Sequence, residues 1–377
     1  MIVVAEKGSV ARAIRRAIKA PITVLALSGH LLELDFPQEY NRWREVNPQQ
    51  LFEAPVKWTV KDPKTYRMLV ETLRSSSNPM LVLATDNDHE GEFIAYEVLL
   101  AARETLGSVK FFRMRFNSTT PSELRRAWET LEPDLNWGWV WKAYFRHKFD
   151  LITGAIYTRL LTLSAREADR NVRLISWGSC QTPTLWFILE REKQIREFKP
   201  ETYYTLEAIL NVQGVKVKVS SSPIKDRVKA ESLYRQAAGR LTATVEAFTL
   251  QREAERKPLP TETDSMLQDL TKILGVSAVK IMGEAEQLYA EGYISYPRTQ
   301  TNQWVKVDHQ QILNMLSTSF LAEHVRLESF NPRDGRKNDG AHPPIYPTRV
   351  YSYRDLKGRI WEYVARRYLA NTVYGDA

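Results

Sequence analysis

The chain has 377 residues, of which 43% are hydrophobic and 26% are charged, and Lys and Arg outnumber Asp and Glu by eight (53 against 45). This length exceeds one ordinary core and indicates two to four domains, while the positive charge favours a polyanionic partner, nucleic acid first. The lone Cys180 excludes an intramolecular disulfide and a multi-cysteine zinc module, and no stretch approaches the eighteen apolar residues of a membrane span.

Strands and helices alternate along the first third of the chain. The apolar runs that predict strands lie at 1–6, 80–85 and 109–116, and a stretch with helical spacing follows each of them. This alternation predicts a mainly parallel sheet. Such sheets gather functional groups at the carboxyl ends of their strands, so Glu6, Asp86 and Asp88 could share one site although about eighty residues separate them.

The rest of the chain changes pattern three times. Residues 137–169 read as mostly helical and mix basic with aromatic side chains. Alternation at 203–219 indicates strands, and 242–257 indicates another strand that runs into a charged connector. Helical spacing returns from Thr261, and 331–344 reads as a long loop.

The segment ATDNDHEGE (84–92) places four carboxylates within seven positions: Asp86, Asp88, Glu90 and Glu92. Like charges this close repel one another, so their crowding needs a reason. A hard cation such as Mg²⁺ would offset the repulsion, because Mg²⁺ is bound through carboxylate oxygens. General acid–base chemistry and a plain acidic loop are the alternatives that this segment alone leaves open.

A second segment, EGYISYPRT (291–299), combines a tyrosine with a stiff backbone and a cation. Pro297 disfavours a helical conformation at Tyr296 and fixes the local chain. Tyr296 is therefore a plausible covalent nucleophile, and Arg298 could clamp phosphate oxygens beside it. Alone the motif is weak, because most tyrosines are packing residues.

Together these segments resemble the type IA DNA topoisomerases, particularly the topoisomerase III branch with an archaeal or eukaryotic flavour. The segments that carry the resemblance are AEKGSVARAI (5–14), ATDNDHEGEFIAYEV (84–98), FDLITGAIYTR (149–159), GSCQTPTLWFILERE (178–192), EGYISYPRTQT (291–301) and AHPPIYPT (341–348). Their order and approximate spacing are those of the family. The acidic segment alone would also fit primases and certain nucleases that share its metal-binding domain.

The resemblance implies an α/β fold followed by α-rich domains. We expect a Rossmann-like Toprim domain at 1–135 and a helical domain that binds single-stranded DNA at 136–200. A partial β arch or hinge is expected at 201–257, and a helical domain that carries the nucleophilic tyrosine at 258–377.

The resemblance also assigns a magnesium site to the Toprim domain. Asp86, Asp88 and Glu90 match its ligands, which bind Mg²⁺ directly or through water. Glu92 stands at a probable helix start, where a structural role is as plausible as a metal role.

Five residues match the family's catalytic positions. Glu6 would protonate the leaving 3′ oxygen, and Lys7 would contact the scissile phosphate. Tyr296, not Tyr293, aligns with the nucleophile that forms a 5′-phosphotyrosine. Arg298 would stabilise the developing negative charge, and His342 would hydrogen-bond the phosphate.

The expected partner is single-stranded and underwound DNA. Arg146, Asp150, Arg159 and Gln181 match positions that line the family's single-strand groove. The phosphotyrosine conserves the energy of the broken bond, so the expected cycle of cleavage, strand passage and religation needs no ATP. In agreement, the sequence contains no GxxxxGK[ST] loop.

The sequence departs from the family pattern in two ways that matter. His89 and Gln300 stand where the family usually has Arg and an acid. The chain also stops soon after His342, so the family's return segment and zinc modules are missing. A fragment, a minimal variant and completion by another chain all remain open, and strand passage is in more doubt than cleavage.

Two rival functions follow from these departures. One is a topoisomerase-like fragment that binds single-stranded DNA without cutting it, and the other is a Toprim nuclease or primase-like enzyme. The lone Cys180 and the lack of a signal peptide lead us to expect a cytoplasmic, nucleoid-associated protein if the source is prokaryotic. The oligomeric state cannot be predicted from the sequence.

Overall fold

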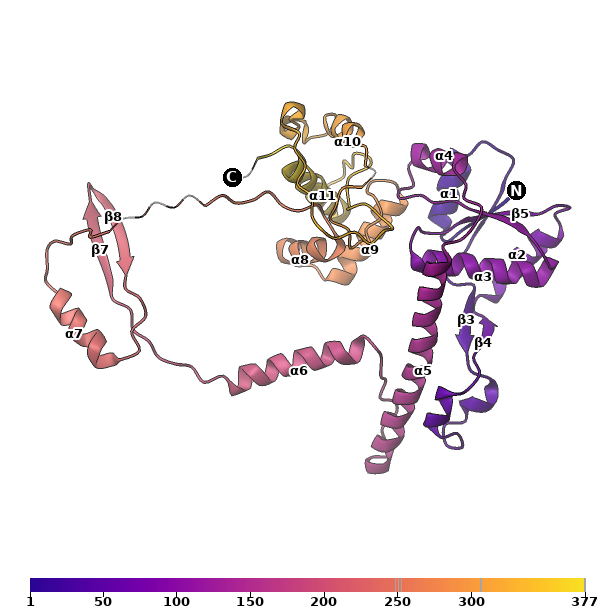
Figure 1. The fold of residues 1–377 in the computed structure, drawn as a ribbon, viewed down its shortest axis with the longest axis horizontal. Coiled ribbons are helices and arrows are strands. Elements are labelled where there is room, and N and C mark those ends of the chain that lie inside the picture. The colour runs from indigo at the N-terminus through magenta and orange to yellow at the C-terminus, as the bar shows by residue number, and fades with distance from the viewer. Residues whose placement is uncertain (248, 250, 252, 306, 376–377) are drawn as a thin grey trace. The chain divides into compact units, whose positions relative to one another are not determined.

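The computed structural model describes residues 1–375 except 248, 250, 252 and 306 (Figure 1). Its contacts divide the chain into two units. The first unit combines Met1–Gly178 with Ala254–Ala377, and the second unit is Ser179–Glu253. The domain boundaries predicted from the sequence stay a prediction.

A four-stranded parallel sheet organises the beginning of the first unit. Its strands are β1 (Ile2–Ala5), β2 (Thr23–Ala26), β5 (Met80–Ala84) and β6 (Lys110–Arg113), in the order β2-β1-β5-β6. The apolar runs of β1 and β5 are buried on both faces, as parallel strands covered by helices require. Ala5 pairs with Ala84, so both central strands end at the same edge. The predicted parallel sheet is confirmed, although β2 was not predicted.

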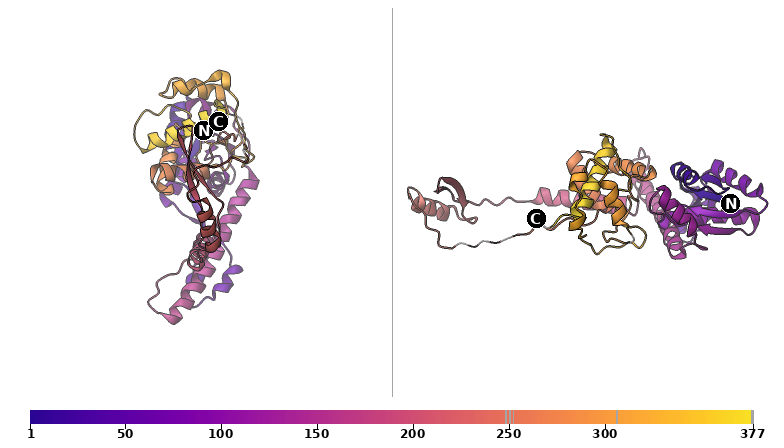
Figure 2. Two further views of the ribbon diagram at one scale, coloured as in Figure 1. Left: turned by 90° about the vertical axis from the view of Figure 1, so that its left-hand side faces the viewer. Right: turned by 90° about the horizontal axis from the view of Figure 1, so that it is seen from above.

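Helices cover both faces of this sheet (Figures 1 and 2). One face packs against α1 (Gly8–Ala17) and α4 (Pro121–Glu129), and the other against α2 (Pro63–Arg74) and α3 (His89–Leu106). Alternating side chains of each strand supply the two cores. Val3 and Val82 enter the first core, whereas Val4 and Leu83 enter the second. The strand ends are therefore held from both sides.

The 32-residue helix α5 (Trp137–Ala168) continues from this layer and confirms the helix predicted at 137–169. Its beginning packs on α3 through Val140 and Ala143. Its later turns contact the segment between two further strands, with Ile156 against Phe36 and Leu51. Those strands, β3 (Leu32–Asp35) and β4 (Lys57–Val60), form an antiparallel pair, and the segment between them contains short 3-10 turns at Gln38–Asn41 and Pro48–Phe52.

The C-terminal part of the first unit is helical, as predicted. Its helices are α8 (Thr263–Leu274), α9 (Ala278–Ala290), α10 (His309–Leu316) and α11 (Leu356–Thr372), with short 3-10 turns at Ala322–His324 and Leu327–Ser329. The buried Tyr289, Ile294 and Trp361 belong to the same core as Val3 and Val82 of the sheet. This shared core brings residues near position 296 to the sheet.

The second unit contains α6 (Gln181–Glu197), the antiparallel pair β7 (Glu207–Val212) and β8 (Val215–Ser220), and α7 (Arg227–Ala237). The β pair confirms the strands predicted at 203–219. The strand predicted at 242–257 is wrong for the described residues of that range, which pair with no neighbouring strand, and positions 248, 250 and 252 lie outside the described residues. In the part of the chain that is described, no helix is both long and apolar enough to cross a membrane.

Candidate active site

Two neighbouring strands bring Glu6, Lys7 and Asp86 together at one edge of the sheet. The backbone N–H of Asp86, just past β5, donates to Glu6 Oε2 at 3.1 Å. Lys7 Nζ lies 3.0 Å from Asp86 Oδ2 and 3.5 Å from Glu6 Oε1, so one ammonium group offsets two carboxylates. The predicted meeting of Glu6 and Asp86 at the strand ends is confirmed.

The side chain of Asp88 caps a helix with one of its carboxylate oxygens. Its Oδ1 accepts the backbone N–H of Gly91 at 2.7 Å and so caps α3. Because of this cap the helix begins at His89, inside the acidic segment, and not after it as the sequence suggested. A Cβ atom on Gly91 would lie 1.9 Å from the carbonyl oxygen of Asp86, so only glycine fits there without a shift.

Tyr296 reaches the acidic edge from a distant part of the sequence. Its hydroxyl donates to Asp88 Oδ2 at 2.6 Å. The side chain is buried, and its ring centroid lies 4.2 Å from that of His342. Tyr293 packs against the Arg349 guanidinium instead, at 3.9 Å. Of the two tyrosines in the motif, Tyr296 is the one beside the carboxylates.

His342 lies over Tyr296 with one ring nitrogen unused. Its Nδ1 is 3.1 Å from Asn117 Oδ1, whereas its Nε2 is buried and has no hydrogen-bond partner. Asp339 Oδ1 accepts the backbone N–H groups of Ala341 and His342 and so holds the turn that presents the ring. An unpartnered buried nitrogen costs free energy and marks a position where a ligand could bind.

Tyr289 is a site residue that the sequence reasoning missed. Its hydroxyl donates to Asp86 Oδ1 at 3.3 Å, and its ring meets that of Tyr296 edge to face, with centroids 5.1 Å apart. It lies on α9, where the helical period predicts only packing. Its place seven residues before Tyr296, two helical turns away if the helix continued, was the only available signal.

Glu92 has a structural role. Its Oε1 lies 2.6 Å from Arg113 Nε and 2.7 Å from Arg115 Nη1, and its Oε2 accepts the backbone N–H of Asn136. The Arg113 guanidinium in turn donates to the carbonyl oxygen of Asp86 at 2.7 Å. Both Glu92 and Arg113 are fully buried. Of the two readings left open by the sequence, the geometry favours the structural one.

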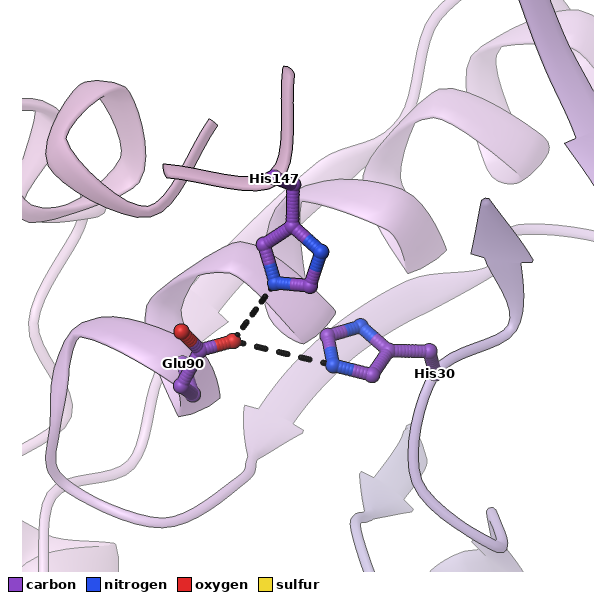
Figure 3. Close-up of side chains that lie close together, drawn as sticks. All are labelled: His30, Glu90 and His147. Carbon is purple, nitrogen blue, oxygen red and sulfur yellow. Dashed lines mark hydrogen bonds and ion pairs between the residues drawn. The ribbon is translucent and has the colours of Figure 1, made fainter. Parts of the chain in front are cut away.

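The side chain of Glu90 points toward His147 and His30 (Figure 3). Its Oε2 lies 2.8 Å from His147 Nε2 and 3.6 Å from His30 Nε2, and its Oε1 lies 3.0 Å from Arg146 Nη1. Among the described residues, Asp86, Asp88 and Glu90 are not found as a converging group of possible metal ligands. The magnesium role of Glu90 stays a prediction that requires its side chain to leave the two histidines.

Arg298 forms an ion pair with Glu286 and lies within electrostatic range of Tyr296 and Asp88. Its Nε lies 2.5 Å from Glu286 Oε1, and its side chain is largely exposed. A role on a phosphate at Tyr296 stays a prediction.

The predicted DNA-contact residues lie in different surroundings. Arg146 and Asp150 form an ion pair at 3.8 Å, one helical turn apart on α5. Arg159 is buried, and its guanidinium donates to the carbonyl oxygen of Tyr40 at 2.6 Å, so it faces protein. Gln181 begins α6 in the second unit. Within the first unit, Arg146 and Asp150 pair with each other on α5, whereas Arg159 is buried against protein.

Burial and crowding shift the protonation of the site. Burial and the Asp86 carboxylate raise the pKa of Glu6 to about 7. Burial lowers the pKa of Lys7, but Asp86 and Glu6 raise it more, so its ammonium form is favoured. Burial and the same carboxylate hold the pKa of Tyr296 far above its usual range, and burial lowers the pKa of His342. Burial and the nearby carboxylates therefore keep the Tyr296 hydroxyl protonated in the site as it stands.

A cleft of about 870 Å³ opens next to these groups. Residues on its walls include Asn87, Arg115, Asn117, Arg126, Trp139 and His342. The amides and the indole offer hydrogen bonds and a stacking surface to unpaired bases. The walls also include Glu123, Glu132 and Asp134, and both guanidinium groups are paired with acids.

Comparison with known proteins assigns the family. The profile described as DNA topoisomerase matches residues 134–374, more than half of the chain, and the profile described as Toprim domain matches residues 1–119. The chain belongs to the type IA DNA topoisomerase family. The resemblance stated from the sequence is thereby confirmed.

Named relatives come from archaea and animals. DNA topoisomerase 1 of Archaeoglobus fulgidus is 35% identical over 357 residues, covering 92% of this chain and 52% of the relative. DNA topoisomerase 3-alpha of Drosophila melanogaster is 33% identical over 374 residues, covering 94% and 29%. Human DNA topoisomerase 3-beta-1 is 34% identical over 366 residues, covering 92% and 42%. The chain thus spans about half or less of the length of these curated relatives.

A solved structure supports the fold. Full-length topoisomerase I from Thermotoga maritima matches with a TM-score of 0.72 at 24% identity, covering 99% of this chain and 61% of that one. At this identity the match shows the fold alone. The predicted α/β fold followed by α-rich segments is confirmed.

Proposed function

We propose that this type IA topoisomerase cuts one DNA strand by forming a 5′-phosphotyrosine at Tyr296 and reseals it without ATP. The observation that carries the proposal is the 2.6 Å hydrogen bond from the Tyr296 hydroxyl to Asp88, at the edge where Glu6, Lys7 and Asp86 also lie. Strand cleavage gives a chemical role, nucleophilic attack, to a phenol that is buried among carboxylates. Packing alone does not explain why its hydroxyl lies beside them.

The proposed reaction uses two proton-transfer groups. As the Tyr296 oxygen attacks phosphorus, its proton passes to Asp88, the acceptor of its hydrogen bond. The bond from phosphorus to the 3′ oxygen breaks, and Glu6 gives that oxygen a proton. A pKa of about 7 leaves Glu6 protonated in much of the population at neutral pH. Religation reverses each transfer, so no energy source is needed.

Two cationic groups would hold the phosphate. The ammonium group of Lys7 is close enough to the acids to contact a phosphate between them and Tyr296. The unpartnered Nε2 of His342 could take up a proton and donate it to a phosphate oxygen, because a nearby anion favours the charged imidazole. Arg298 would add a further contact through the terminal nitrogens of its guanidinium group.

Asp86 fits a direct ligand of a bound Mg²⁺ ion, and Asp88 would hold the ion through water because its Oδ2 is the proton acceptor in the proposed reaction. Both offer carboxylate oxygens, the ligand type that Mg²⁺ prefers, and one or two such ligands suffice because the ion keeps several waters. The ammonium group of Lys7 already lies against Asp86, as expected where negative charge must be offset. A bound ion would supply positive charge that stabilises the phenolate and orients the phosphate.

The substrate is proposed to be single-stranded or underwound DNA, as the positive net charge and the cleft favour. Strand passage, and with it relaxation or decatenation, is part of the proposal. In a prokaryotic source the work would take place at the nucleoid in the cytoplasm.

The test is covalent label transfer. The protein is incubated with a 3′-end-labelled single-stranded oligonucleotide and Mg²⁺, denatured, and run on a protein gel. Wild type and Tyr293→Phe should carry the label, and Tyr296→Phe should lose it while binding the oligonucleotide within a few-fold of wild type. Tyr293 is the matched control because it lies in the same motif but packs on Arg349.

Two other results would overturn the proposal. Labelled fragments released free of protein would indicate a Toprim nuclease. Intact oligonucleotide with normal binding would indicate a single-strand-binding protein that does not cut.

A further inference from the structure

Three possible metal ligands from distant elements converge outside the carboxylates at Tyr296 (Figure 3). His30 lies between β2 and β3, Glu90 in the first turn of α3, and His147 within α5. One ligand atom from each lies within 4.8 Å of the other two. No second group of this kind is found among the described residues.

We propose that His30, Glu90 and His147 bind a divalent transition-metal ion of the Zn²⁺ class. Two imidazole nitrogens and one carboxylate oxygen are the donors that such ions select, with water in the fourth position. Metal–ligand bonds of about 2.0–2.2 Å place tetrahedral donors roughly 3.3–3.5 Å apart. The present distances of 2.8 Å from Glu90 to His147 and 3.6 Å from Glu90 to His30 lie on either side of that spacing.

An outer carboxylate already orients His30. The fully buried Glu97 places Oε1 2.8 Å from His30 Nδ1, and its Oε2 accepts the backbone N–H groups of Leu31 and Leu32. With its hydrogen on Nδ1, His30 directs the lone pair of Nε2 toward Glu90. A carboxylate behind a metal-binding histidine fixes its tautomer and ring orientation in this way. A positive charge between Nε2 and the Glu90 oxygen, carried by a proton or by a metal ion, would satisfy both atoms.

A single aromatic residue positions both imidazoles. Phe93 is buried, and its ring stacks on that of His147 with centroids 4.8 Å apart and planes 29° apart. The ring of His30 meets Phe93 edge to face at 6.0 Å. Both rings are therefore already held in place, so metal binding costs little conformational entropy.

Charge and exposure also permit an ion. Arg146 binds Oε1 of Glu90, which leaves Oε2 to the histidines, although its positive charge lowers the affinity for a cation. The three side chains are partly exposed, so an ion can enter and keep a water. An ion held here would keep Glu90 away from Asp86 and Asp88. The proposal does not depend on the chemistry of Tyr296.

The test is a Co²⁺ titration of the full chain followed by its visible absorption. All proteins carry Cys180→Ser, which removes the only thiol. We expect one Co²⁺ per chain with visible d–d bands, displaced by Zn²⁺ and not by an equal concentration of Mg²⁺. His30→Gln and His147→Phe should each weaken binding at least tenfold, and the phenyl ring of the latter preserves packing on Phe93.

Two matched controls separate this site from others. His324→Gln removes a histidine that lies beside a single acid, Glu323, and should leave Co²⁺ binding unchanged. Asp86→Asn combined with Asp88→Asn should also leave the bands in place. Bands that vanish in this double variant would place the ion at the acidic site and overturn the proposal.

The proposal would also be overturned if the bands were absent, or if wild type and both histidine variants bound Co²⁺ equally well. Either result would mean that protons alone bridge the three side chains. Because an unfolded variant would imitate a lost site, thermal unfolding without metal is measured for each protein. X-ray absorption of the Zn²⁺-loaded wild type gives an independent answer. Two imidazole ligands are expected, and a spectrum with only oxygen ligands would refute the site.

Discussion

At the scale of single residues, Gly91 sets the position of the acidic edge. We expect Gly91→Ala to destabilise the protein by about 1–3 kcal/mol, because its Cβ would lie 1.9 Å from the carbonyl oxygen of Asp86. Gly283→Ala on α9 is the control, since nothing lies within 4 Å of the added Cβ. It should be neutral or stabilising by up to about 1 kcal/mol. Urea unfolding measures the free energy of unfolding of both variants. Equal changes in the two would mean that the backbone at Gly91 shifts at little cost to make room for the Cβ atom.

A substitution at Glu92 distinguishes a structural role of this residue from a role as a metal ligand. Glu92→Gln should reduce the free energy of unfolding by about 3–5 kcal/mol, because Arg113 keeps a buried charge with its partner removed. The loss should be the same with and without Mg²⁺. Glu45→Gln, which breaks an exposed pair with Arg42, should leave stability unchanged. A stability loss that appeared only with Mg²⁺ present would restore the metal role.

The sequence predicted the site residues that directly follow an apolar strand, because strand ends have known places in a parallel sheet. Glu6, Asp86 and Asp88 follow apolar strands, and the carboxyl ends of parallel strands meet. Tyr289 could not be predicted, because its contact with Asp86 depends on how α9 packs against the sheet. The turn of Glu90 toward His147 was equally hidden, since α5 begins far along the chain.

At the scale of elements, one carboxylate holds the turn that presents His342. Asp339 accepts the backbone N–H groups of Ala341, His342 and Gln300, and the hydroxyl of Thr299. Asp339→Ala should lower the yield of the covalent DNA adduct by about tenfold or more, because small displacements of a positioned group are costly.

Two variants distinguish positioning from general damage in this loop. Asp339→Asn should recover part of the yield, since an amide oxygen still accepts hydrogen bonds. Asp334→Ala removes a carboxylate that accepts the backbone N–H of Trp304 in the same loop, away from His342. It should keep the yield, and an equal loss would show that the loop responds as a whole.

The contact between α10 and α11 should respond to pH. Burial lowers the pKa of His309 despite the nearby Asp308 and Asp334, and its Nδ1 lies 2.8 Å from the Tyr368 hydroxyl. The unfolded chain then binds more protons than the folded one, so stability falls as pH drops below about 6.5. His309→Gln should reduce the slope of the unfolding free energy against pH, by the equivalent of up to one bound proton. Urea unfolding between about pH 7.5 and 5 measures it, and parallel curves would contradict it.

Element prediction succeeded where one period dominated. The buried runs of β1 and β5 and the long helix α5 follow from their patterns alone. Strand β2 was missed because only its two middle residues are buried, so it lacks the continuous apolar run of β1. Strands β3 and β4 were missed because their pairing spans a segment of irregular turns. The start of α3 was placed too late, because its cap, Asp88, is itself one of the acids.

At the scale of the whole molecule, the first unit joins two parts of the sequence that only folding unites. Its core contains Val3 and Val82 of the sheet together with Tyr289 and Trp361. Periodicity predicts each part, but the surface where they meet depends on side-chain shape. Family resemblance supplied that meeting in advance, and the hydrogen bond from Tyr296 to Asp88 is its clearest sign.

This organisation predicts where a protease cuts first. Among the described residues of the second unit only Ala230 is buried, so little free energy opposes local opening there. The loop at 331–344 is exposed too, but hydrogen bonds from Gly335 and Lys337 to Asn302 anchor it. Brief trypsin treatment should therefore cut within 179–253 before it cuts the loop.

The two products of that cut should stay together. Thr119 donates to the carbonyl oxygen of Tyr289 and Asn87 to that of Ala341, so contacts across the shared core bind the fragments. We expect one peak on gel filtration and two bands on a denaturing gel. Fragments that separate without denaturant would mean that the second unit is needed as a covalent tether, because the core between the sheet and the tyrosine-bearing helices would then be too weak to hold them.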